Sequence, residues 1–142
     1  MTYATQQGLI DRFGEATIRE LTDRGDPPAG AIDADVVARA LTDTDAVIDG
    51  YLRTRYQTPL AEVPPQIADI AFTIAVYKLH RWEPDAKIAR DYADAQRALR
   101  EIADGKIRLT ATLIAPTETG GTGARLTDRA RPFTADNMTG FI

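Results

Sequence analysis

A long amphipathic stretch over residues 33–55 constrains the fold of this chain most strongly. Large side chains recur there at the 3.6-residue period of an α-helix, and Asp33 stands in front of them as an N-cap. The predicted buried stripe consists of Val37, Leu41, Thr44, Ile48, Tyr51, Leu52 and Arg55. Because a single helix of this length is only marginally stable in water, other helices must cover its apolar stripe.

Capping residues and prolines divide the rest of residues 1–105 into further helices. Thr5 is a suitable N-cap for a first helix that ends at Gly14, and a short helix follows over residues 15–21. Residues 64–82 form the most apolar predicted helix, opened by two prolines. A last helix is predicted over residues 85–104, with Gly105 as its stop signal.

The pattern changes after Gly105. Apolar residues alternate with polar ones over residues 106–114, which predicts a short strand. Residues 116–123 read as a flexible linker because they are rich in Gly and Thr. We therefore expect an all-α protein: a bundle of about four to five helices over residues 1–105, then a short strand and an extended C-terminal arm over residues 106–142.

The end of the chain carries arginines among large apolar side chains, among them Phe133 and Phe141. Two interpretations remain open for it. The segment is either disordered in the free protein or becomes ordered against a partner, since its few apolar residues cannot offset the entropy cost of ordering alone. Apolar side chains are costly to leave in water, which favours a docking peptide.

The composition argues against most kinds of catalysis and against a nucleic-acid-binding surface. The chain contains no Ser and no Cys, so the usual nucleophilic triads cannot be built, and no cofactor is predicted. The single histidine, His80, is expected to be a surface or capping residue and not a metal ligand. The net charge is −4, and no apolar run approaches the ~20 residues of a membrane span.

Several segments, in order and at these spacings, resemble a family of small phage proteins typified by a head–tail connector protein of phage Mu. The matching segments include Tyr3-Ala4-Thr5, Leu9-Ile10-Asp11-Arg12-Phe13-Gly14, Ile48-Asp49-Gly50-Tyr51-Leu52, Tyr77-Lys78-Leu79 and Ile102-Ala103-Asp104-Gly105-Lys106. Shorter matches lie at residues 32–33, 38–41, 55–56, 59–60 and 69–71, and at Pro64, Tyr92, Ala95 and Leu99. The resemblance covers residues 1–109, and beyond them it is limited to residues 131–133 and 138–141.

The resemblance implies a structural virion protein and not an enzyme. Similar proteins form a ring, expected to be dodecameric, beneath the portal of a tailed phage or a phage-like gene transfer particle. Such a ring is assembled in the bacterial cytoplasm and lies at the head–tail junction, away from any membrane. Its partners would be the portal protein, a tail-side connector or stopper protein and further copies of itself, with double-stranded DNA passing through without specific binding.

Two sets of residues are candidates for these roles. A channel wall would be acidic, so that DNA slides without sticking, and the predicted channel-facing residues are Asp35, Asp43, Asp45 and Asp49. The predicted anchors for the portal or a neighbouring copy are Arg131, Phe133, Met138 and Phe141.

Two other classes of protein compete with this interpretation. The first is a small helical regulator, similar to an antitoxin, whose disordered tail folds on a partner protein. The second is an enzyme subunit that uses carboxylates and His80, which would require a pocket with perturbed carboxylates. No spacing in the sequence predicts such a pocket.

Overall fold

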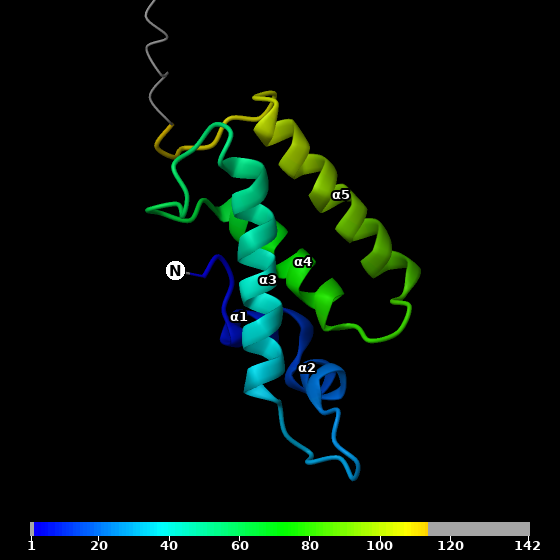
Figure 1. The fold of residues 1–142 in the computed structure, drawn as a ribbon. Coiled ribbons are helices and arrows are strands. Elements are labelled where there is room, and N and C mark those ends of the chain that lie inside the picture. Colours follow the sequence, from blue (N-terminus) through cyan, green and yellow to red (C-terminus); the bar gives the residue numbers. More distant parts are fainter. Residues whose placement is uncertain (1, 114–142) are drawn as a thin grey trace, which may run out of the picture.

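The computed structural model describes residues 2–113, and within them the chain forms five α-helices (Figure 1). The helices are α1 (Gln6–Phe13), α2 (Glu15–Thr22), α3 (Ala34–Leu52), α4 (Pro65–Leu79) and α5 (Ala86–Ala103). The three longer helices, α3, α4 and α5, pack against one another, and α1 and α2 contact the end of the bundle where α3 begins. The predicted all-α bundle of four to five helices is confirmed.

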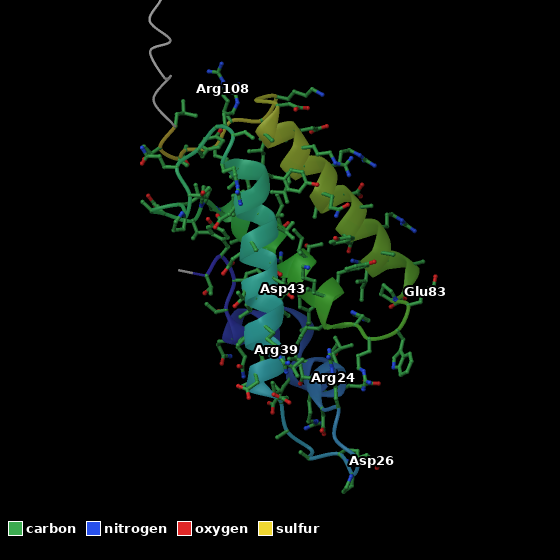
Figure 2. The ribbon with its side chains drawn as sticks, in the orientation of Figure 1. Arg24, Asp26, Arg39, Asp43, Glu83 and Arg108 are labelled. Atoms are coloured by element: carbon green, nitrogen blue, oxygen red, sulfur yellow. The ribbon has the colours of Figure 1, made fainter. Side chains whose placement is uncertain are left out.

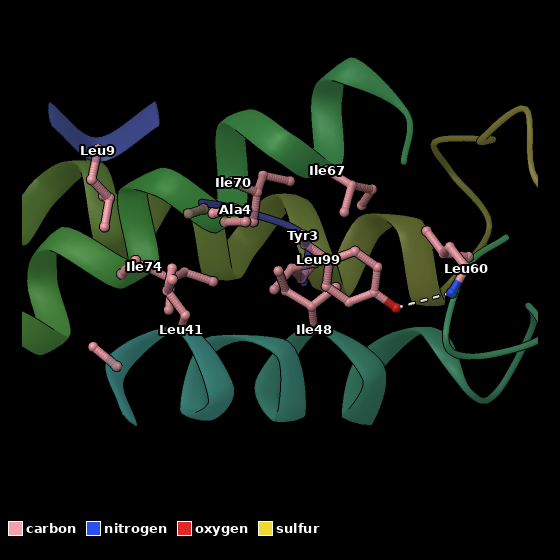
Figure 3. Packing of buried hydrophobic residues seen from close by; sticks show 14 of the residues in the cluster. Tyr3, Ala4, Leu9, Leu41, Ile48, Leu60, Ile67, Ile70, Ile74 and Leu99 are labelled. Carbon is pink, nitrogen blue, oxygen red and sulfur yellow. Dashed lines mark hydrogen bonds between the residues drawn. The ribbon is translucent and has the colours of Figure 1, made fainter. Parts of the chain in front are cut away.

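The core lies between the three long helices. Leu41 and Ile48 of α3 face Ile70 and Ile74 of α4, and Leu99 of α5 closes the space (Figure 3). The predicted stripe of α3 is thus the face that becomes buried, with Tyr51 and Arg55 half-buried at its end. At roughly 1.5–3 kcal/mol for each large apolar side chain, this burial stabilises helices that would be marginal alone.

The helix ends follow the local signals, with two differences. The side chain of Asp33 accepts hydrogen bonds from the backbone N–H groups of Asp35 and Val36, as an N-cap should. Helix α3 ends at Leu52, before Arg55, because the next residues tighten into a turn in which Tyr56 N donates to Leu52 O. Helix α4 ends at Leu79, whose carbonyl accepts a hydrogen bond from Arg24 Nη2 at 3.0 Å.

The strand predicted over residues 106–114 is wrong for the part that the structure describes. Residues 106–112 are irregular, and the only pairing near them is an isolated antiparallel bridge between Tyr56 and Leu113. Two contacts hold the segment: Gln57 N donates to Thr112 O, and Leu109 N donates to the Tyr56 hydroxyl. The alternation reflects the packing of Ile107, Leu109 and Ala111 on the helical core, since no neighbouring strand extends the bridge into a ladder.

Candidate functional site

Two of the four predicted channel-facing aspartates bind the start of the chain. The backbone N–H of Tyr3 donates to Asp45 Oδ1 at 2.9 Å, and the Tyr3 hydroxyl donates to Asp49. The same hydroxyl accepts a hydrogen bond from Leu60 N at 3.1 Å (Figure 3). Tyr3 is only 3% exposed, so this node joins the N-terminal segment, α3 and the α3–α4 loop inside the bundle.

The node shifts the pKa values of Tyr3 and Asp45. Burial, and then the hydrogen bond to Asp49, raise the pKa of Tyr3 to about 12. Burial also raises the pKa of Asp45, and the neighbouring carboxylate of Asp49 acts in the same direction. A carboxyl with a raised pKa is a common mark of an active site. Here burial against the N-terminal segment is the main cause of the raised pKa of Asp45, and the hydrogen bond from Tyr3 N opposes it.

The four aspartates therefore do not form one stripe. Asp35 and Asp43 are exposed, whereas Asp45 and Asp49 are half-buried against Tyr3. At 100° per residue, Asp43 and Asp45 point to opposite sides of α3. Arg39 is exposed between Asp35 and Asp43, so the outer face of α3 carries both signs of charge (Figure 2).

The predicted anchors Arg131, Phe133, Met138 and Phe141 lie outside the described residues. The described part ends at Leu113, which is 55% exposed. The sequence continues for 29 residues beyond Leu113. The structure therefore does not test these four residues.

A groove between α4 and α5, which sequence reasoning missed, is a second candidate site in the described part. It has a volume of about 660 Å³, and α1 borders it at one end. The lining residues are Arg12, Phe13, Asp69, Ile70, Thr73, Val76, Asp85, Lys87, Ile88, Asp91, Asp94, Ala95 and Ala98. Alanines at positions 95 and 98 of α5 leave space between the two helices that larger side chains would fill.

Most of the acidic groups around this groove already have cationic neighbours. Arg12 of α1 pairs with Asp69 of α4 across the end of the groove. Along α5, Lys87 Nζ lies 2.5 Å from Asp91, and Arg97 lies 3.0 Å from Asp94. Exposed pairs of this kind contribute only about 0–1 kcal/mol each, so an incoming charged group can replace one partner at small cost.

An aromatic side chain also stands out at the turn between α4 and α5. Trp82 is 80% exposed, and Arg81 lies over its ring at 5.6 Å from the centroid. His80 ends α4, and its Nδ1 is 2.7 Å from Val76 O. His80 is thus a helix-end residue, in agreement with the capping role expected from the sequence.

Within residues 2–113, no group of three or more His, Asp or Glu side chains is arranged to hold a metal ion. None of the helices in this part of the chain combines the length and the apolar character that crossing a membrane requires.

The chain is similar to known phage proteins along most of its length. The family described as Bacteriophage Mu, Gp36 matches residues 3–127. Gene product J of Escherichia phage Mu is 35% identical over 106 residues, which cover 75% of this chain and 74% of that protein. Mu-like prophage FluMu protein gp36 of Haemophilus influenzae is 29% identical over 140 residues, 99% of this chain and 98% of that protein. The chain therefore belongs to the bacteriophage Mu Gp36 family of phage proteins.

Proposed function

We propose that this protein is a head–tail connector of a tailed phage or a phage-like gene transfer particle. Copies of it form a ring under the portal, extend the DNA channel and provide the docking surface for the next tail component. The observation that carries the proposal is the match to a phage Mu family over residues 3–127. The connector role itself comes from the resemblance and needs the experiment described below.

The architecture supports this role. A connector needs a stable body and segments that bind its neighbours, and the described residues supply a helical body with one continuous core. Beyond Leu113, the sequence offers arginines and large apolar side chains suited to binding a partner. Arg131, Phe133, Met138 and Phe141 stay the proposed anchors for the portal or a neighbouring copy.

A ring implies a particular kind of contact between copies. Each copy must present two different surfaces, because head-to-tail contacts close into a ring only when one surface fits the other on the next copy. A twelvefold ring would match the symmetry of a dodecameric portal. We propose that the ring is located at the head–tail junction, with the tail-side connector or stopper protein on its far side.

The proposed lumen is defined by the exposed aspartates of α3. Asp45 and Asp49 are engaged by Tyr3, so Asp35 and Asp43 are the members of the predicted set that remain available to face DNA. Asp35→Asn/Asp43→Asn should make DNA adhere to the channel wall and be retained longer in assembled particles, because less negative charge is left to repel the phosphates, whereas Glu20→Gln on α2 should not. Unchanged assembly and unchanged DNA retention in the double variant would remove the lumen proposal.

We also propose that the protein acts without catalysis. The sequence lacks the Ser and Cys of the usual nucleophilic triads. The carboxyl with a raised pKa, Asp45, is bonded to the Tyr3 amide and does not line the α4–α5 groove. These observations support a structural role over the competing enzyme-subunit interpretation.

Co-sedimentation with the assembled cognate portal tests the connector role. The full chain should bind saturably, near one copy per portal subunit, and a chain truncated after Gly123 should not bind. An intact helical circular dichroism spectrum of the truncated chain serves as the control for folding. Absence of binding at every concentration would remove the proposal, and the helical regulator whose tail folds on another protein would then be the leading alternative.

A further inference from the structure

The α4–α5 groove has the form of a binding site for an extended peptide. Its floor is apolar and is made by Ile70 and Val76 of α4 and Ala95 of α5, with the half-buried Ile88 at its edge. The volume of about 660 Å³ is within the range of sites that hold compact ligands or side-chain anchors. No described segment of the chain occupies it.

The groove is acidic at its edges. Four aspartates line it, against the two cationic side chains of Arg12 and Lys87, so the lining carries a net charge of −2. Asp85, at the start of α5, forms no ion pair with the described residues. A matching ligand would therefore combine positive charge with at least one large apolar side chain.

Residues 125–133 of this chain have that chemistry. Arg125, Arg129 and Arg131 stand against the single acidic residue Asp128, a net charge of +2, and Phe133 closes the segment. Arginine is well suited to carboxylate partners because its guanidinium binds them through two parallel hydrogen bonds. The charge of this segment is thus opposite and equal to that of the groove.

The path of the chain favours the groove of another copy. After α5 the chain crosses the bundle to the α3–α4 loop (Figure 1). There Gln57 N donates a hydrogen bond to Thr112 O, and Tyr56 forms an isolated antiparallel β-bridge with Leu113. Leu113 therefore lies beside the α3–α4 loop. The coloured ribbon in Figure 1 ends there, on the far side of α3 from α5. The twelve residues from there to Arg125 span at most about 40 Å, enough to cross to an adjacent domain.

We propose that residues 125–133 of one copy bind in the α4–α5 groove of the next copy. The arginines pair with the aspartates at the edges, and Phe133 covers the apolar floor. The contact joins two different surfaces of the same chain, which is the head-to-tail geometry that closes rings. It involves copies of this chain alone, so it can hold or fail independently of portal binding.

Disulfide cross-linking tests the contact directly, since the natural chain has no cysteine. One full-length variant carries Ile88→Cys in the groove and a second carries Phe133→Cys. Mixed under mild oxidation, they should form a heterodimer about tenfold faster than Phe133→Cys mixed with Ala46→Cys, which places the thiol on the exposed face of α3. Ala98→Cys provides a second groove position if Ile88→Cys perturbs folding.

The charge component has its own control. Adding Asp91→Asn/Asp94→Asn to the Ile88→Cys variant brings the net charge of the groove lining to zero. This change should slow heterodimer formation severalfold. Adding Asp35→Asn/Asp43→Asn to the same variant should leave the rate unchanged. Equal rates of heterodimer formation of Phe133→Cys with Ile88→Cys and with Ala46→Cys would overturn the proposal. A chain carrying both Ile88→Cys and Phe133→Cys that closes only on itself would assign the segment to its own groove and overturn the exchange between copies.

Discussion

The Tyr3 hydroxyl donates a hydrogen bond to the Asp49 carboxylate, 46 positions further along the chain. The same oxygen accepts from Leu60 N, so one phenol near the start of the chain joins the last turn of α3 to the α3–α4 loop. That loop in turn contacts the last described residues through Tyr56 and Gln57. The node therefore helps to position the point at which the C-terminal segment leaves the bundle.

Tyr3→Phe should destabilise the bundle by about 1–3 kcal/mol, because the buried Leu60 N–H loses its acceptor and Asp49 loses a donor. Tyr51→Phe, the same chemical change at a half-buried position of α3, is the control and should have a smaller effect. Urea denaturation monitored by circular dichroism measures both. Equal stability of the Tyr3→Phe variant and the natural protein would show that the node does not stabilise the fold.

The stability difference between the natural protein and Tyr3→Phe should depend on pH in the alkaline range. The folded pKa of Tyr3, about 12, lies above its ordinary value of 10.0, so the fold favours the protonated phenol. This contribution is complete below the ordinary value and is lost as the pH rises through about 12. The stability difference between the natural protein and Tyr3→Phe should therefore shrink over that interval.

Asp45→Asn should stabilise the protein at neutral pH. The pKa of Asp45 is raised above its ordinary value of 3.8 by burial and by the charge of Asp49, so the natural protein loses stability as the pH rises through that raised pKa. An asparagine keeps an oxygen for the Tyr3 N–H and cannot ionise. Melting temperatures should differ at neutral pH and converge in acid. A less stable variant at neutral pH would mean that the charged hydrogen bond outweighs burial.

Thr22→Val should cost more than Thr44→Val, although both threonines are fully buried. The Thr22 hydroxyl accepts from Asp33 N at the start of α3, and losing that acceptor costs about 1–3 kcal/mol. The Thr44 hydroxyl only donates to Ala40 O, which also has its helical partner, so the change there should stay near 0.5–1.5 kcal/mol. Chemical denaturation ranks the two, and the reverse order would contradict this account.

Local sequence signals predicted the helices because the residues that begin and end a helix lie close to its ends in the sequence. The cap at Asp33, the two prolines at the start of α4 and Gly105 after α5 lie within a few residues of the ends that they set. Gly105 has φ +77°, a conformation that side chains other than glycine rarely adopt. Alternation over residues 106–112 was misleading, because Ile107, Leu109 and Ala111 pack on the helical core at alternate positions without forming a strand.

The candidate sites were much harder to predict, since they depend on distant contacts. Nothing near Tyr3 indicates that its partners are on α3, so Asp45 and Asp49 looked like solvent-facing acids. The α4–α5 groove also has no local signal, because its aspartates resemble any solvated helix face and its alanines resemble core residues. Only the packing of α5 against α4 shows that they share one surface.

Gly50→Ala should stabilise the protein by roughly 0.5–1 kcal/mol, because glycine inside a helix carries an entropy cost. A Cβ at Gly50 meets no atom within 4 Å, so the substitution introduces no clash. Gly8→Ala in α1 is the matched comparison, and it should bring no gain because its Cβ collides with the ring of Phe72. Thermal melting separates the two, and equal stabilisation by both would contradict the packing of α1 on α4.

Truncation after Gly123 should leave the bundle folded while abolishing binding to the portal or to neighbouring copies. The described residues up to Leu109 form a continuous core of their own, so helical circular dichroism and a cooperative thermal transition should persist. The removed segment contains every proposed anchor, each of which could contribute about 1–2 kcal/mol or more at an interface. A matched chain that keeps its full length but carries Arg131→Ala/Phe133→Ala should lose binding to a similar extent. Loss of helical signal on truncation would instead show that the segment belongs to the fold, and retained binding would place the contact surface within the helical bundle.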